Sequence, residues 1–170
     1  MNKETYIKMT APFRKNTKAA RILELINHIC TYSVFIAYPV ILIYMLFAKD
    51  PSLVWLITVP LDGFIAVSVF RYIINRPRPY EKFNLPPVIS KDTSGKSFPS
   101  RHVFSAFIIA FTVLIYAPFS SLLWFIGIVM VLLAIVIAFV RVISGVHYIS
   151  DVIGALIFAL AEAAIVLYMI

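Results

Sequence analysis

Cysteine and charged side chains are both scarce in this sequence. Cys30 is the single cysteine among 170 residues, which excludes an internal disulfide and a metal site built from several cysteines. Charged residues make up only 14% of the chain, against 62% hydrophobic residues and a mean hydropathy of +0.95. Soluble domains average about 45–50% apolar residues, so this composition excludes a soluble globular protein. It predicts an integral membrane protein, and the length leaves room for a single domain covering residues 1–170.

Acidic residues are also few. There are 8 Asp and Glu against 15 Lys and Arg, which gives a formal net charge of +7. Such an excess of positive charge favours contact with anionic lipid headgroups or with a phosphorylated substrate. Nucleic acid is not an expected partner, because most of the chain is too apolar to present a basic face to water. The sequence also lacks a repeat of about 20–50 residues, and its first 20 residues lack the apolar core of a signal peptide.

What the sequence does have is long apolar runs, and they predict about five transmembrane helices. Each run is judged against the roughly 20 residues that a helix needs to cross a bilayer. The predicted spans cover residues 29–47, 53–74, 101–116, 122–140 and 147–170. They are separated by polar turns at 49–51 and 117–120, a proline-rich loop at 75–99 and a short break at 144–145. We therefore predict an all-α helical membrane bundle with its transmembrane core at residues 29–170.

Residues 1–28 form a separate basic segment. From Thr17 to His28, apolar residues recur at helical spacing beside basic ones, which predicts a short amphipathic helix lying on the lipid headgroups. A disordered tail is the alternative interpretation of this segment.

The alternating direction of the spans predicts that four charged stretches meet at one membrane face. The second and fourth spans end on this face, and the third and fifth begin there. The stretches are Arg71–Arg78, Ser97–His102, Arg141 and His147–Asp151. The other ends of the spans carry little charge, so a functional site is expected on the charged face.

Two of these stretches have both an anion-binding interpretation and a simpler one. Arg71 and Arg78 are seven residues apart, about two helical turns, so they project to one side if the helix runs that far, and Pro77 and Pro79 end the helix there. The serine and proline before His102 predict a helix start, where free N–H groups and the helix dipole attract anions such as phosphate. The simpler alternatives are arginines that extend to the headgroups and an ordinary helix cap with a histidine at the interface.

His147 and Asp151 carry the strongest chemical signal. Spaced by four residues, they share one face of a helix. A carboxylate bonded to one imidazole nitrogen fixes the tautomer and raises the basicity of the other nitrogen, which makes a nucleophile or a general base. Two histidines and an aspartate could instead hold zinc, and an isolated ion pair at a helix end is the third alternative. The converging arginines favour an anionic ligand over a metal cation.

Together these stretches resemble the three signature motifs of the type 2 phosphatidic acid phosphatase family. The family includes bacterial undecaprenyl-pyrophosphate and phosphatidylglycerophosphate phosphatases. Its motifs read Lys-x6-Arg-Pro, Pro-Ser-Gly-His and Ser-Arg-x5-His-x3-Asp. Their counterparts here are Arg71–Pro79, Pro99–His102 and Val140–Asp151. The resemblance covers residues 71–151, the predicted order of spans extends it to the carboxyl end, and residues 1–28 are not covered.

The resemblance implies a membrane lipid phosphatase that works through a phosphohistidine intermediate, without a metal or other cofactor. His147 would attack phosphorus while Asp151 orients it, and His102 would protonate the leaving lipid oxygen and then activate water. The phosphate would be bound by Arg71, Arg78, Ser100 and Arg141, together with N–H groups near Arg101.

The implied substrate is a lipid phosphate or diphosphate of the undecaprenyl pyrophosphate, phosphatidic acid or phosphatidylglycerophosphate class. Membrane lipids are the other expected partners. A non-catalytic binder or transporter of anionic phospholipid is the alternative function, since it would also explain the arginines.

Three positions depart from the family motifs. Arg71 stands in place of lysine, and Val140 stands in place of serine. Arg101 replaces a glycine that allows close backbone approach, so its side chain either obstructs the phosphate or points aside and adds positive charge at the rim. None of these changes removes a catalytic histidine or the aspartate, so an active enzyme is expected.

Two arguments bear on orientation in the membrane. Most Lys and Arg fall on the charged face, which the positive-inside rule would place in the cytoplasm. In bacterial members of the family that the sequence resembles, the active site usually faces outward. We expect a multi-pass protein of the cell membrane with its active site on the extracytoplasmic face.

Two acids, Asp62 and Glu162, lie within the apolar runs. Each is about 13–17 Å from the charged face at about 1.5 Å per residue, and neither has a basic residue at its depth. We expect a structural hydrogen bond, either between the two acids or across an interface between copies of the chain. A homo-oligomer is therefore an open alternative.

Overall fold

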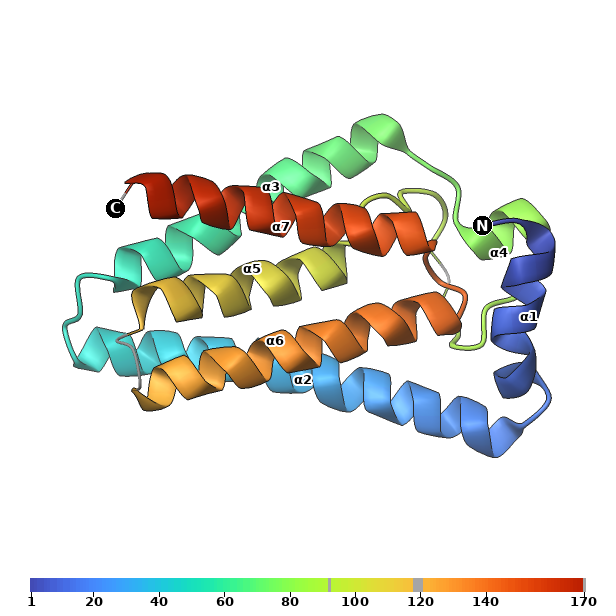
Figure 1. The fold of residues 1–170 in the computed structure, drawn as a ribbon, viewed down its shortest axis with the longest axis horizontal. Helices are drawn as coiled ribbons and strands as arrows, with labels where there is room; N and C mark the ends of the chain where they lie inside the picture. The colour runs from blue at the N-terminus through green and yellow to red at the C-terminus, as the bar shows by residue number, and fades with distance from the viewer. Residues whose placement is uncertain (92, 118–120, 170) are drawn as a thin grey trace.

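The computed structural model describes residues 1–91, 93–117 and 121–169, and every secondary-structure element in these ranges is a helix. In chain order the helices are α1 (Lys3–Arg14), α2 (Thr17–Phe47), α3 (Leu53–Ile74), α4 (Pro79–Phe83), α5 (Arg101–Tyr116), α6 (Leu122–Ile143) and α7 (Ile149–Met169). The long helices run side by side, while α1 lies across one end of the bundle (Figure 1). The prediction of an all-α membrane bundle is confirmed.

Four helices in the described ranges, α2, α3, α6 and α7, are long and apolar enough to cross a membrane. The remaining predicted span, α5, is apolar but has only 16 residues. That is about 24 Å of helix, less than the roughly 30 Å of a hydrocarbon core. α3 and α5 begin and end at the predicted residues, whereas α6 continues to Ile143. The turn expected at 117–120 falls largely on residues 118–120, which lie outside the described residues.

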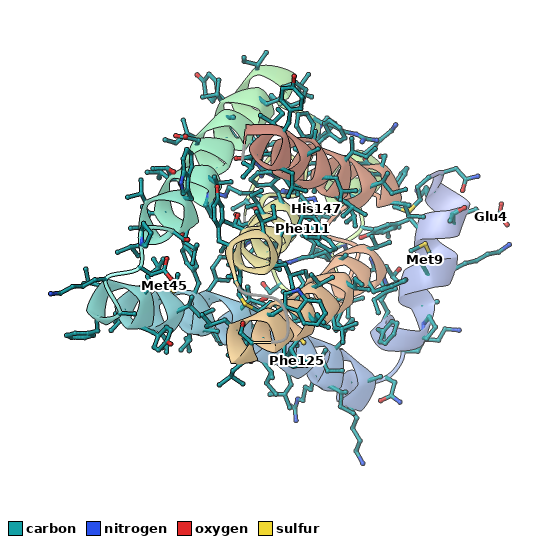
Figure 2. The ribbon with its side chains drawn as sticks, turned by 60° about the vertical axis from the view of Figure 1, so that its left-hand side comes forward. Glu4, Met9, Met45, Phe111, Phe125 and His147 are labelled. Carbon is teal, nitrogen blue, oxygen red and sulfur yellow. The ribbon has the colours of Figure 1, made fainter. Side chains whose placement is uncertain are left out.

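α5 is the centre of the bundle because it is apolar on nearly every side. All residues from Val103 to Ala110 are buried. The helix contacts α2, α3, α6 and α7, and Figure 2 shows it enclosed by them. A helix that is hydrophobic all round is stable when it is buried. Its neighbours therefore hold α5 in place, and with it the first turn that carries His102.

The amino-terminal segment differs from the prediction. The stretch from Thr17 to His28 is not a separate interfacial helix but the first part of α2. Asn16 caps it by accepting hydrogen bonds from two amides of the first turn, at 3.0 and 3.2 Å. No proline or glycine occurs in α2 before Pro39, so nothing ends the helix where the apolar run begins. The separate helix is α1, capped by Asn2, and the alternative of a disordered tail is also wrong.

The ends of α3 and α6 and the beginnings of α5 and α7 lie at the same end of the bundle, as alternating spans predict (Figure 1). The loop from α3 to α5 contains the short helix α4, which the apolar pattern did not predict. α4 starts at Pro79, a residue that favours the first turn, and Glu81 accepts a hydrogen bond from the amide of Arg78 at 2.7 Å. α1 packs on this loop through Tyr6, whose ring centre lies 5.4 Å from that of Phe83.

Candidate active site

A cavity of about 460 Å³, here named the polar pocket, opens at the charged end of the bundle. Six of the eight residues predicted for the site line it: Arg71, Arg78, Arg101, His102, Arg141 and His147. The other two, Ser100 and Asp151, are fully buried and do not line the cavity. The fold thus gathers residues from α3, α5, α6 and two loops into one place.

The loop after α6 places His147 by returning to the end of that helix. The carbonyl of Arg141 accepts hydrogen bonds from the amides of Val146 and His147, at 3.2 and 3.1 Å. Gly145 makes the turn with a φ of 77°, a conformation that favours glycine. Because Arg141 supplies this carbonyl and also a side chain to the pocket, the loop holds Arg141 and His147 at one site.

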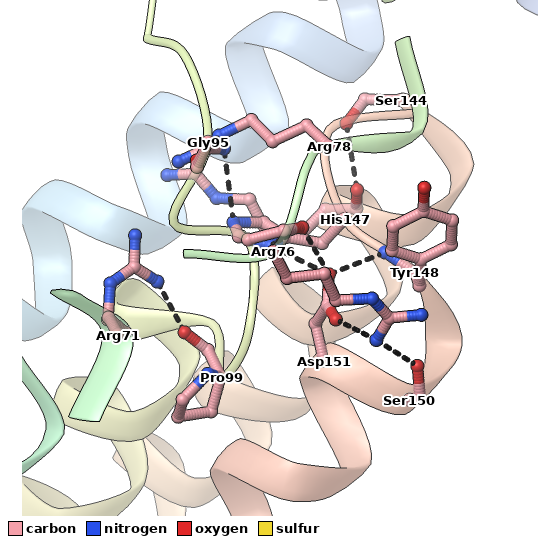
Figure 3. A network of polar contacts seen from close by, with 12 residues as sticks. Arg71, Arg76, Arg78, Gly95, Pro99, Ser144, His147, Tyr148, Ser150 and Asp151 are labelled. Carbon is pink, nitrogen blue, oxygen red and sulfur yellow. Dashed lines mark hydrogen bonds and ion pairs between the residues drawn. The ribbon is translucent and has the colours of Figure 1, made fainter. Parts of the chain in front are cut away.

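His147 is buried between an acid and an arginine (Figure 3). Its Nδ1 lies 3.3 Å from Oδ2 of Asp151, and its Nε2 lies 3.5 Å from Nη1 of Arg78. Since a guanidinium only donates, Nε2 is the acceptor and Nδ1 carries the proton that is donated to Asp151. Burial, together with the charge of Arg78, outweighs the hydrogen bond to Asp151 and lowers the pKa of His147 to about 4. The imidazole is therefore neutral at neutral pH, with a lone pair on Nε2.

Asp151 is fully buried and accepts hydrogen bonds on both oxygens (Figure 3). Besides His147, Oδ2 accepts from the hydroxyl of Ser97 and from the amide of Tyr148, the latter at 2.9 Å. Oδ1 accepts from Nη1 of Arg76 at 2.8 Å. Neither Ser97 nor Arg76 was among the predicted site residues, because both are distant from Asp151 in the sequence and no local pattern pairs them with it.

Three buried arginines surround the pocket. Arg71, Arg78 and Arg141 are 8%, 5% and 6% exposed. The guanidinium groups of Arg71 and Arg78 donate to backbone carbonyls of the loop before α5. Within the described ranges, Nε of Arg141 has no hydrogen-bond partner. Neutral carbonyls orient guanidinium groups but leave their charge uncompensated, so the pocket is suited to an anion such as phosphate, which arginine binds with two hydrogen bonds.

The start of α5 carries three of the predicted residues. His102 is half-buried and lines the pocket. The amide of Ser100 donates to the carbonyl of Asp151 at 3.0 Å, which joins the start of α5 to the start of α7. Arg101 is exposed, and its guanidinium carbon lies 5.2 Å from the centre of the Phe64 ring on α3. The side chain thus lies over Phe64 and also lines the pocket, where it adds positive charge, and its effect on a bound phosphate stays a prediction.

Comparison with known proteins identifies the family. A sequence model of the PAP2 superfamily matches residues 52–170, a range that contains every predicted site residue. The chain belongs to the PAP2 superfamily. The predicted family is thereby confirmed, and with it the prediction of a membrane phosphatase, a hydrolase that acts on lipid phosphates.

Two solved structures share the fold of this PAP2 superfamily member. LpxE from Aquifex aeolicus matches with a TM-score of 0.72 and 20% identity, over 98% of this chain and 94% of that chain. A PAP2-type phosphatidylglycerolphosphate phosphatase from Bacillus subtilis matches with a TM-score of 0.65 and 22% identity, over 98% of this chain and 85% of that chain. Identities this low show a common fold. Among curated proteins, no sequence matches the chain.

The two intramembrane acids of this PAP2 superfamily member lie near the contact between α3 and α7. The carboxyl group of Glu162 packs against Gly63, where an added Cβ atom would stand 2.0 Å from Oε2. Asp62, the residue before Gly63, is exposed on the surface of the bundle. Glu162 therefore occupies space that only a glycine on α3 leaves open, and the hydrogen bond expected between the two acids stays a prediction.

Proposed function

We propose that this membrane phosphatase transfers the phosphoryl group of its lipid substrate first to His147 and then to water. The observation that carries the proposal is the setting of His147, a neutral imidazole whose Nδ1 is bonded to Asp151 and whose Nε2 lies beside Arg78. An isolated ion pair at a helix end would not require three buried arginines around it. Burying three guanidinium groups in one place is unfavourable, and a bound phosphate offsets that cost.

The proposed first step is an in-line attack of Nε2 of His147 on phosphorus. The bond between phosphorus and the lipid oxygen breaks, and His102, whose protonated form is stabilised by the bound phosphate anion, donates its proton to that oxygen. Asp151 stabilises the positive charge that develops on His147, through the hydrogen bond at Nδ1. The three buried arginines hold the phosphoryl oxygens, where negative charge shifts in the transition state.

In the second step, water attacks phosphorus of the phosphohistidine while His102 takes a proton from that water. The bond between phosphorus and Nε2 of His147 breaks, inorganic phosphate leaves, and both histidines regain their starting protonation states. No step calls for a metal, because the arginines neutralise the charge that Mg²⁺ neutralises in kinases.

The proposed substrates are lipids of the undecaprenyl pyrophosphate, phosphatidic acid and phosphatidylglycerophosphate classes. The third class is supported by the fold shared with the phosphatase from Bacillus subtilis, whose name states that substrate. The proposed location is the cell membrane, with the polar pocket on the extracytoplasmic face.

The test is phosphate release from these three lipids by the purified protein in detergent, with and without a chelator. We expect release from at least one lipid, unaffected by the chelator and abolished in His147→Ala and His102→Ala. His28→Ala is the matched control, because His28 is the third histidine of the chain and is exposed on α2. Activity that requires added Zn²⁺ would contradict the mechanism. Tight lipid binding without turnover would favour the non-catalytic binder or transporter.

A further inference from the structure

Helix α1 lies before residues 52–170, the range that the PAP2 superfamily model matches, yet it packs across the end of the bundle that holds the site (Figure 1). Two of its residues, Tyr6 and Thr10, are buried, and Tyr6 is only 1% exposed. A fully buried aromatic ring contributes much to the packing of the elements that it joins. The contacts of Tyr6 therefore show what α1 holds in place.

Tyr6 contacts both loops that build the site. A Cβ atom added at Gly145, in the loop between α6 and α7, would stand 2.7 Å from the hydroxyl oxygen of Tyr6 and 2.8 Å from Cε2 of its ring. The ring centre lies 5.4 Å from that of Phe83 on α4, and the hydroxyl donates to the carbonyl of Leu85 at 3.2 Å. One side chain thus joins the α6–α7 loop, which carries His147, to the α3–α5 loop.

The α6–α7 loop is fixed elsewhere by its own backbone. At its start, the carbonyl of Arg141 accepts two of its amides, and at its end the amide of Tyr148 donates to Oδ2 of Asp151 at 2.9 Å. Between these points Gly145 has no side chain to hold it, and Tyr6 fills the space beside it. Tyr6 does not line the polar pocket, so it acts on the reaction only through this loop.

Tyr6 is itself held in one orientation by α1. Nη2 of Arg14 donates to its hydroxyl at 3.1 Å, and the guanidinium carbon lies 5.5 Å from the ring centre. Nε of Arg14 donates to the hydroxyl of Thr10 at 2.9 Å, and that hydroxyl donates to the carbonyl of Tyr6 at 2.9 Å. Because these contacts all come from one helix, the ring is a fixed support against which the α6–α7 loop packs.

We propose that Tyr6 is a positioning residue, whose ring holds the α6–α7 loop so that Nε2 of His147 faces the phosphorus atom of the substrate. This role rests on the proposed function, because it takes His147 to be the nucleophile. An attacking atom must lie about 3–3.5 Å from its target, and a displacement of about 1 Å costs about a hundredfold in rate. Arg71 and Arg78 are oriented by backbone carbonyls outside the α6–α7 loop, so the binding of phosphate should depend much less on the ring.

The test compares the wild type, Tyr6→Ala and Tyr6→Phe on one lipid phosphate in detergent. The chemical step is measured by kcat/KM, and binding is measured by the inhibition constant of inorganic phosphate. Tyr6→Ala is expected to lower kcat/KM about tenfold to a hundredfold and to leave the inhibition constant within about threefold, because the loop loses its support while the arginines keep theirs. Tyr6→Phe keeps the ring and should retain most of the wild-type kcat/KM.

The pH dependence of Tyr6→Ala separates positioning from a loss of folded protein. Burial lowers the pKa of His147 to about 4, and the charges of Arg78 and Arg141 act in the same direction. Asp151 acts in the opposite direction. Without the ring of Tyr6 the loop is less buried, so this pKa should rise toward 6.5, and the acidic limb of kcat/KM should move to higher pH. A smaller fraction of folded protein lowers the whole profile without moving it.

Phe13→Ala is the matched control, because it removes an aromatic ring from the same helix. Phe13 packs against a separate cluster that contains Leu23, Ile89 and Val140. This variant should lower Tm, since α1 loses packing, but it should keep the kcat/KM and the acidic limb of the wild type.

Three results would overturn the role of Tyr6 while His147→Ala is inactive. They are a wild-type kcat/KM in Tyr6→Ala, a reduced kcat/KM in Tyr6→Ala with the acidic limb unmoved, and an equal loss of kcat/KM in Phe13→Ala. Phosphate release by His147→Ala would instead contradict the proposed function, and with it any positioning of His147 by Tyr6.

Discussion

Arg76 and Asp151 form an ion pair, with Nη1 of the arginine 2.8 Å from Oδ1 of the acid. The same nitrogen donates to the hydroxyl of Ser150 at 2.8 Å, and the guanidinium carbon lies 4.1 Å from the centre of the Tyr148 ring. These contacts hold Arg76 against the start of α7. Arg76 therefore fixes one oxygen of Asp151 while the other oxygen faces His147 (Figure 3).

Arg76→Gln is expected to lower kcat by about tenfold to a hundredfold with little change in KM, the usual effect of losing a group that orients a functional side chain. Loss of this cation also leaves the negative charge of Asp151 unpaired, so Asp151 stabilises the protonated form of His147 more strongly. The pKa of His147 should then rise, and the acidic limb of the pH–rate profile should move to higher pH. Arg76→Lys keeps the charge and should restore the profile. The measurement is kcat and KM for one lipid phosphate across pH.

Ser150→Ala is the control for Arg76, because it removes another partner of the guanidinium and leaves the pair with Asp151 intact. Its pH–rate profile should match that of the wild type. If Arg76→Gln lowers activity without moving the profile, Arg76 supports the fold and does not position Asp151.

The acidic limit of activity follows from the burial of His147. Its pKa is lowered from 6.5 to about 4, and it attacks phosphorus only when neutral. Activity should therefore persist as pH decreases through 6.5 and fall only near pH 4. In Asp151→Asn the carboxylate that raises this pKa is gone, so the limb should move to still lower pH while kcat falls. The measurement is kcat/KM corrected for ionisation of the substrate. A wild-type limb centred near 6.5 would contradict a neutral, buried His147.

The ends of α3 and α5 could be predicted to the residue, because neighbouring residues in the sequence mark them. Polar residues or prolines bound the apolar runs of α3 and α5, so both ends of each helix are marked. Alternation of the spans then brings most of the predicted side chains to one pocket. The start of α2 at Thr17 could not be found, because its amphipathic first turns continue into the apolar run without a proline or glycine.

The partners of Asp151 show why the rest of the site could not be predicted. The hydrogen bond with His147 was predicted from two residues on one face of a helix, but His147 lies in the loop before α7, and Asp151 in the first turn accepts from it and from the amide of Tyr148. The bonds from Arg76 and Ser97 depend on how the loop between α3 and α5 folds back, because the amide of Ser97 donates to the carbonyl of Arg76 at 2.9 Å. This one tertiary contact brings both residues to Asp151, and no periodic pattern in the sequence predicts it. The cavity between α2, α3 and α5 likewise depends on how these three helices pack against one another, which the sequence alone does not predict.

Gly145 should resist substitution for two separable reasons. Its φ of 77° disfavours any side chain, by about 1–2 kcal/mol. A Cβ atom there would also stand 2.7 Å from the hydroxyl oxygen of Tyr6 on α1. Gly145→Ala is expected to lower both Tm in detergent and kcat, because the same loop carries His147. The ring carbon Cε2 of Tyr6 would stand at 2.8 Å as well, so in a Tyr6→Ala background, which removes the oxygen and the ring, Gly145→Ala should lower Tm by less. Thermal unfolding of the four proteins measures this coupling, and equal decreases would contradict the contact.

Arg101 lines both the polar pocket and a second cavity between α2, α3 and α5. Its guanidinium group lies over the ring of Phe64. Because its side chain is exposed and lies over Phe64, we expect it to attract the phosphate without holding the oxygens that react. Arg101→Ala should raise KM about threefold to tenfold and leave kcat within about twofold, as expected for an exposed charge. Arg101→Lys keeps the charge and should resemble the wild type.

Added salt screens exposed charges, so the difference between Arg101→Ala and the wild type should shrink at high ionic strength. Steady-state kinetics at low and high salt measure both effects. A large fall in kcat at constant KM would show instead that Arg101 contacts the phosphoryl group in the transition state, as the three buried arginines are proposed to do.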